Sequence, residues 1–137
     1  MSTIIDIAEF KSSKFEPILP EESQVNPEVY GAELAYWVST ELARRGLATM
    51  YPGSEDWGWY VEWFTETGSE FALHCTNVEG MSNKWLISLR RHARKMFGRD
   101  KPSFTEAEEL IKALREILDA EPSIDELKWH GISKHAT

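Results

Sequence analysis

The most informative part of the sequence is Glu55-Asp56-Trp57-Gly58-Trp59-Tyr60-Val61-Glu62-Trp63-Phe64. Successive side chains of a β-strand point to opposite faces, so alternation predicts one face with Trp57, Trp59, Val61 and Trp63. Tyr60, Glu62 and Phe64 fall on the other face. Aromatic residues on both faces are typical of a central strand, or of a strand whose second face is covered by a partner. The stretch therefore predicts a sheet and a candidate contact surface, but it identifies no chemistry.

The aromatic strand itself is predicted over residues 57–66. Further strands are predicted before and after it. Alternating or apolar runs occur at residues 4–7, 48–51, 71–76, 84–89 and 124–129. The turn Thr67-Gly68-Ser69 joins the aromatic strand to residues 71–76 as a hairpin. Residues 48–89 thus predict a meander of up to four antiparallel strands.

Two amphipathic helices are predicted from apolar residues at helical spacing. The first begins at Asn26-Pro27, an N-cap followed by a proline at the first helical position, and ends at Gly46. The second begins near Thr105 with a capping box, Ser103 with Glu106 or Thr105 with Glu108, and ends before Pro122. Each helix has one apolar stripe, which favours packing on one face of a sheet.

The predicted fold class is α+β, a two-layer arrangement of a four- or five-stranded, mainly antiparallel sheet with two helices on one face. A chain of 137 residues with 42% hydrophobic residues fits one domain with one core. We expect an extended or mobile N-terminal arm over residues 1–26, the domain over residues 27–130, and a frayed tail over residues 131–137.

The composition excludes several classes of protein. No apolar run approaches the roughly 18 residues that a membrane span needs, and the first residues lack the pattern of a signal peptide. A lone Cys75 cannot form an internal disulfide, which favours a reducing, cytoplasmic setting. We find no nucleotide-binding glycine motif, no hydrolase motif and no metal-ligand spacing, so no cofactor and no metal is predicted.

The net charge of −8 is unevenly distributed. Residues 1–80 carry 14 acidic and 4 basic residues, a charge of −10, whereas residues 81–137 carry 9 acidic and 11 basic residues, a charge of +2. The basic residues concentrate between Lys84 and Lys101 and include Arg90, Arg91 and Arg94. This cluster could receive an acidic protein surface or the phosphates of a nucleic acid, or it could be a solvated rim. The overall acidity argues against nucleic acid.

Three blocks of sequence resemble a family of small, uncharacterised bacterial cytoplasmic proteins. The blocks are Gly31-Ala32-Glu33-Leu34-Ala35-Tyr36-Trp37, Glu55-Asp56-Trp57-Gly58-Trp59 and Glu121-Pro122-Ser123-Ile124. The matching blocks cover roughly residues 27–130, a length that fits one domain. This resemblance implies a bacterial origin and a single domain. It implies no activity, because the family has none assigned.

Two groups of residues are candidates for chemistry, each with a structural alternative. Glu55 and Asp56 could converge with Trp59 and His74 on a carboxylate and imidazole pocket, or they could simply cap the backbone of a turn. His74 and Cys75 are neighbours on one strand and point to opposite faces, so they cannot form a catalytic dyad. Cys75 is expected in the core, and His74 is expected to be the more available group.

The function favoured by the sequence is non-enzymatic binding or regulation in the bacterial cytoplasm, through contact with another protein or with a second copy of the chain. An inhibitor or immunity role is an analogy based only on small size and acidity. The residues of the candidate surface are Glu55, Asp56, Trp59, Tyr60, Phe64, His74, Arg90, Arg91 and Arg94. The alternative is a small enzyme or ligand-binding domain that uses the pocket, and nucleic-acid binding is a weaker third possibility. No membrane partner is predicted.

Overall fold

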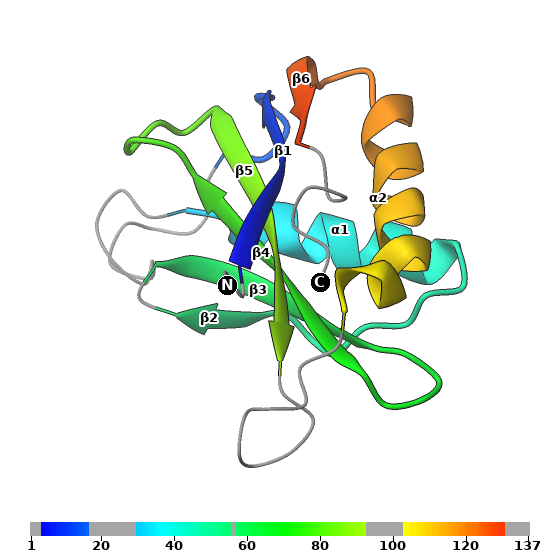
Figure 1. Ribbon diagram of the computed structural model, residues 1–137. Coiled ribbons are helices and arrows are strands. Elements are labelled where there is room, and N and C mark those ends of the chain that lie inside the picture. Colours follow the sequence, from blue (N-terminus) through cyan, green and yellow to red (C-terminus); the bar gives the residue numbers. More distant parts are fainter. Residues whose placement is uncertain (1–3, 17–29, 56, 93–102, 131–137) are drawn as a thin grey trace.

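The computed structural model describes residues 4–16, 30–55, 57–92 and 103–130 (Figure 1). Its elements, in chain order, are β1 (Ile4–Lys11), α1 (Ala32–Arg44), β2 (Gly53–Glu55), β3 (Gly58–Phe64), β4 (Glu70–Asn77), β5 (Lys84–His92), a 3₁₀ helix (Phe104–Ala107), α2 (Glu108–Ala120) and β6 (Asp125–Trp129). The six strands form one sheet in the order β2-β3-β4-β5-β1-β6. Every neighbouring pair is antiparallel.

The α+β class with an antiparallel sheet and two helices is confirmed, but the predicted number of strands is wrong. The sixth strand is β1 (Ile4–Lys11), which lies in the segment that was expected to be an arm outside the domain. Strand β2 pairs only three residues with β3. The pattern over residues 48–51 suggested a strand there, whereas the described strand begins at Gly53. Three residues are too few for alternation to be recognised in a sequence.

The N-terminal segment lies inside the sheet. Ile4–Lys11 forms β1 between β5 and β6, whereas the sequence suggested only a short strand over residues 4–7 within an arm. Phe15, which follows the strand, is 1% exposed and lies edge-on to Trp85 at 6.3 Å between ring centroids. Residues up to 16 therefore belong to the domain. The remainder of the expected arm and the expected tail lie outside the described residues.

One core fills the space between the helices and one face of the sheet. Helix α1 contributes Leu34, Ala35, Val38 and Leu42, and α2 contributes Leu110, Leu114, Ile117 and Leu118. These residues pack on Val61 and Trp63 of β3, Leu73 of β4 and Leu89 of β5. The other face of the sheet is turned away from both helices, and we call it the open face. No helix among the residues described is long and apolar enough to cross a membrane.

The helix boundaries are only partly those expected. Helix α1 begins at Ala32, because Tyr30 and Gly31 are not helical, and the cap expected at Asn26 lies outside the described residues. The capping box at Ser103 is confirmed: its side chain accepts from the Thr105 amide at 3.2 Å, and Glu106 accepts from the Ser103 amide. This box starts the 3₁₀ helix, and α2 continues from it.

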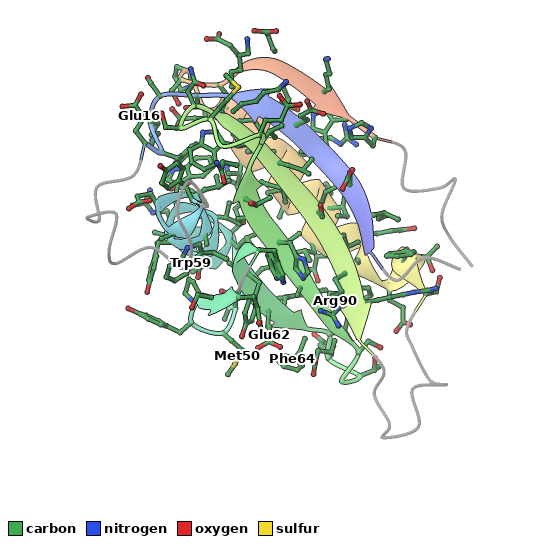
Figure 2. The ribbon with its side chains drawn as sticks, turned by 90° about the vertical axis from the view of Figure 1, so that its left-hand side faces the viewer. Glu16, Met50, Trp59, Glu62, Phe64 and Arg90 are labelled. Carbon is green, nitrogen blue, oxygen red and sulfur yellow. The ribbon has the colours of Figure 1, made fainter. Side chains whose placement is uncertain are left out.

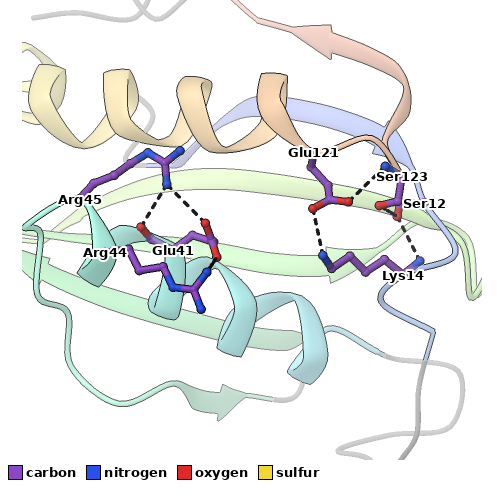
Figure 3. Close-up of polar contacts among 7 residues, drawn as sticks. All are labelled: Ser12, Lys14, Glu41, Arg44, Arg45, Glu121 and Ser123. Carbon is purple, nitrogen blue, oxygen red and sulfur yellow. Dashed lines mark hydrogen bonds and ion pairs between the residues drawn. The ribbon is translucent and has the colours of Figure 1, made fainter.

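Polar contacts fasten the segment after β1 to the end of α2 (Figure 3). Lys14 Nζ donates to Glu121 at 2.9 Å, and the Ser12 and Ser123 hydroxyls lie 2.9 Å apart. Burial acts to raise the pKa of Glu121, but hydrogen bonds from Lys14 and Ser123 outweigh it and hold that pKa below its ordinary value. Phe15 therefore directly follows two residues that are tied to the end of α2.

Candidate functional site

A cavity of about 170 Å³ opens on the open face of the sheet, away from the helices. The residues that line it come from β2, the β2–β3 turn, β3, β4 and β5. They are Glu55, Trp57, Tyr60, Glu62, Ala72, His74 and Arg90. We call this the open-face cavity.

The floor of the cavity is explained by strand register. Ala72 of β4 pairs with Glu62 of β3 on one side and with Arg90 of β5 on the other. Directly paired residues project from the same face of a sheet. The carboxylate of Glu62 and the guanidinium of Arg90 therefore lie on either side of the Ala72 methyl group. Adjacent strands lie about 4.8 Å apart, which separates the Glu62 and Arg90 backbones by roughly 10 Å. The small Ala72 side chain thus leaves a hollow between two long charged ones.

The aromatic wall of the cavity is a stack of two rings. The Trp57 ring lies on the His74 ring with centroids 4.0 Å apart and an interplanar angle of 18°. Tyr60 stands next to them, 6.3 Å from Trp57 between ring centroids. The stack leaves His74 only 8% exposed, whereas Trp57 is 38% exposed. His74 was expected to be the more available group, and that expectation is wrong because Trp57 covers it.

Trp57 reaches this position because Gly58 brings the β2–β3 turn onto β4. Gly58 has φ of +151°, and a Cβ there would lie 3.1 Å from the Cys75 carbonyl oxygen and from Thr76. The Thr76 hydroxyl also donates to the Trp57 carbonyl at 3.0 Å. Alternation predicted Trp57 on the helix face of a regular strand, but the residue lies in the turn. The backbone at Gly58 breaks the alternation.

The cavity contains charges of both signs. Arg90 is partly buried and Glu55, at the end of β2, is exposed. Within the described ranges, neither of these side chains takes part in an ion pair. The cavity therefore offers a cationic and an anionic group to a ligand, one on each side of the aromatic wall.

The structure brings together four of the residues proposed from the sequence: Glu55, Tyr60, His74 and Arg90. Glu62 and Ala72 were missed as site residues, although their places follow from the same alternation that located Tyr60. Phe64 lies on the open face at 43% exposure, outside the cavity lining. Figure 2 shows Glu62, Phe64 and Arg90 on this side of the sheet.

Two proposed site residues lie on the other face. Trp59 is half-buried against the core, 6.5 Å from Tyr36 between ring centroids, and does not line the cavity. Arg91 is 5% exposed, and its guanidinium carbon lies 4.6 Å from the centre of the Phe104 ring. The expectation of an exposed Arg91 is wrong, since alternation along β5 places it with Leu89 on the helix face. Asp56 and Arg94 lie outside the described residues.

Cys75 is a core residue, 0% exposed, and burial raises its pKa to about 12. Only the thiolate is a strong nucleophile, so the folded protein should protect this thiol. We expect no reaction of Cys75 with a colorimetric thiol reagent at pH 8, and one equivalent of reaction after unfolding in guanidinium chloride. A prompt full equivalent from the folded protein would contradict the buried position of Cys75 on β4.

A second surface feature lies at the β2 edge of the sheet. Tyr36, Met50 and Tyr51 are 39%, 53% and 81% exposed, and we call them the β2-edge patch. The Tyr36 and Tyr51 rings meet edge-on with centroids 5.3 Å apart. A hydrogen bond between their side chains raises the pKa of Tyr36, with burial adding to the rise. The Met50 amide donates to the Glu62 carbonyl at 2.9 Å, which fixes the patch to β3.

The described part of the chain contains no group of three or more His, Cys, Asp or Glu side chains arranged to hold a metal ion. Comparison with known proteins found no matching family model, no matching curated protein and no matching solved structure. The open-face cavity and the β2-edge patch are therefore the two features of the molecule from which a function can be proposed.

Proposed function

We propose that this chain is a small binding protein that acts by contact with a basic protein partner through the β2-edge patch. The observation that carries the proposal is the distribution of exposed apolar side chains. Six large hydrophobic residues are exposed in the described chain, and five of them belong to α1, the segment before β2, the β2–β3 turn or β3. These five are Tyr36, Met50, Tyr51, Trp57 and Phe64.

Exposed apolar residues that gather around one edge of a sheet are typical of a contact surface. Tyrosine and tryptophan are also the residues enriched where binding energy concentrates, because they combine a large apolar area with a polar group. The edge-on contact between the Tyr36 and Tyr51 rings restricts both side chains before binding. Less side-chain entropy is then lost when a partner docks.

Charge favours a basic partner over a second copy of the chain. Residues 31–80 build α1, β2, β3 and β4, and they contain 8 acidic and 2 basic residues, a formal charge of −6. Two such surfaces repel one another, whereas a basic surface is attracted. We therefore place the partner's basic residues around a central apolar contact with Tyr51.

The setting we propose is the bacterial cytoplasm, as the resemblance of the three sequence blocks and the single unpaired Cys75 favour. Inhibition of a basic enzyme would suit an acidic protein with an apolar contact site. This role is an analogy of size and charge and assigns no particular target.

The proposal is tested by affinity capture of partners with tagged protein at moderate salt. The test variant is Met50→Ser with Tyr51→Ser, and the matched control is Met81→Ser, since Met81 is an exposed methionine of the β4–β5 turn at 40% exposure. Loss of one central aromatic contact weakens the binding free energy by about 2 kcal/mol, which lowers the affinity roughly 30-fold. We expect recovery of one stoichiometric basic protein with the parent chain and the control, and loss of that protein with the double variant. Equal recovery with all three proteins would remove the β2-edge patch from the proposal.

A further inference from the structure

We propose that the open-face cavity binds a small zwitterion with the chemistry of a free α-amino acid that carries an apolar or aromatic side chain. The evidence is the juxtaposition of an arginine, a glutamate and a stacked indole around one small hollow. None of the three residues of the β2-edge patch lines this cavity, although Trp57 of the cavity wall is also one of the five exposed apolar residues noted above. Neither proposal requires the other to hold.

The carboxylate of the ligand is assigned to Arg90. Arg90 lines the cavity, and it has no ion-pair partner among the residues that the structure describes. The planar fork of arginine matches a carboxylate in a bidentate arrangement. Arg90 also stands at the β5 side of the cavity, opposite the acidic residues, so one ligand can engage both signs of charge.

The ammonium group is assigned to Glu55. This residue lines the cavity from β2, and it too has no ion pair within the described ranges. An ammonium group carries three donors and no acceptor, and a carboxylate is its natural partner. Glu62 adds a second negative charge to the same side of the cavity. These two carboxylates also disfavour the binding of free phosphate, because they would repel it and only Arg90 would attract it.

The apolar part of the ligand is assigned to the Trp57 ring. One face of this ring covers His74, and 38% of the residue is still exposed. Aromatic rings prefer offset or edge-to-face partners, and Trp57 and Tyr60 both line the cavity. The Ala72 side chain leaves the floor free for such a group.

Size supports a single amino acid over a larger ligand. Pockets for drug-sized molecules usually measure about 300–1,000 Å³, and this cavity measures about 170 Å³. A nucleotide would not fit within it. For a ligand of amino-acid size with modest efficiency per atom, we expect a Kd of about 1 mM or below.

The test is isothermal titration of the full chain with three matched probes. L-Phenylalanine has both charges, phenethylamine lacks the carboxylate, and 3-phenylpropionate lacks the ammonium group. We expect L-phenylalanine to bind at least tenfold more tightly than either analogue, because each loses one charge-assisted hydrogen bond. Equal binding of all three probes, or no binding of L-phenylalanine at millimolar concentration, would overturn the proposal.

Variants separate the two charge contacts. With Arg90→Gln, L-phenylalanine and phenethylamine should bind alike, and with Glu55→Gln, L-phenylalanine and 3-phenylpropionate should bind alike. Arg44→Gln is the control, since Arg44 lies at the end of α1 and pairs with Glu41 outside the cavity. Circular dichroism checks that each variant is folded. Unchanged discrimination in folded Arg90→Gln and Glu55→Gln would overturn the assignment, and Tyr51→Ser should leave all three affinities unchanged.

Discussion

Trp85→Ala is expected to lower the free energy of unfolding by about 3–5 kcal/mol, the range for truncation of a large buried aromatic residue. Trp85 is 0% exposed, and its indole nitrogen donates to the Ser12 carbonyl at 3.0 Å. The variant would open a cavity beside Phe15 and remove the hydrogen-bond donor to a carbonyl of the segment after β1. Native domains are stable by only about 5–15 kcal/mol, so this loss would leave a marginal fold. Urea denaturation followed by circular dichroism measures it.

Trp57→Ala is the matched control for this prediction. Both variants remove an indole, but Trp57 is 38% exposed and lies on the open face, so it buries less apolar area. We expect a loss of less than about half that of Trp85→Ala. Equal losses in the two variants would contradict the assignment of Trp85 to the core and of Trp57 to the surface.

Gly58→Val is expected to destroy the cavity and to cost about 1–3 kcal/mol in stability, the range for a strained backbone position. The new Cβ would meet the Cys75 carbonyl and Thr76, and the backbone φ of +151° is unfavourable for a branched residue. The β2–β3 turn must then move away from β4 and carry Trp57 off His74. In a proton NMR spectrum, the His74 ring signals should lose the upfield shift that a stacked indole causes.

Gly68→Ala is the control for this second prediction. Gly68 lies in the β3–β4 turn with φ of +90°, and no heavy atom lies within 4 Å of a Cβ built there. An alanine at this position strains the backbone, but its Cβ meets no neighbouring atom. We therefore expect some loss of stability and unchanged His74 signals. A Gly58→Val protein that keeps the shifted His74 signals would contradict the role of Gly58 in seating Trp57.

Much of the fold follows from local patterns in the sequence. The apolar stripe from Leu110 to Leu118 locates α2, and the alternation of Phe71, Leu73 and Cys75 gives the buried face of β4. These segments are long and regular, so each contains enough turns or pairs for its period to be recognised. Val61 and Trp63 alternate along β3 in the same way, and they mark its buried face.

The site was only partly predictable, because its decisive contacts are between strands. The position of Trp57 depends on the backbone at Gly58, which a count of alternating residues does not include. Arg90 and Arg91 looked like one charged rim, but neighbours in β5 face opposite ways, so only Arg90 reaches the cavity. Extending the alternation of Ile87 and Leu89 by one step would have placed Arg91 in the core.

Contact with a basic partner through the β2-edge patch is tested most directly by site-specific photocrosslinking. A benzophenone amino acid is placed at position 51 in one protein and at position 112, an exposed site on α2, in another. Both proteins are irradiated with the captured partner under the same conditions. We expect a covalent adduct from position 51 and none from position 112. An adduct from position 112 alone, or equal adducts from both positions, would contradict it.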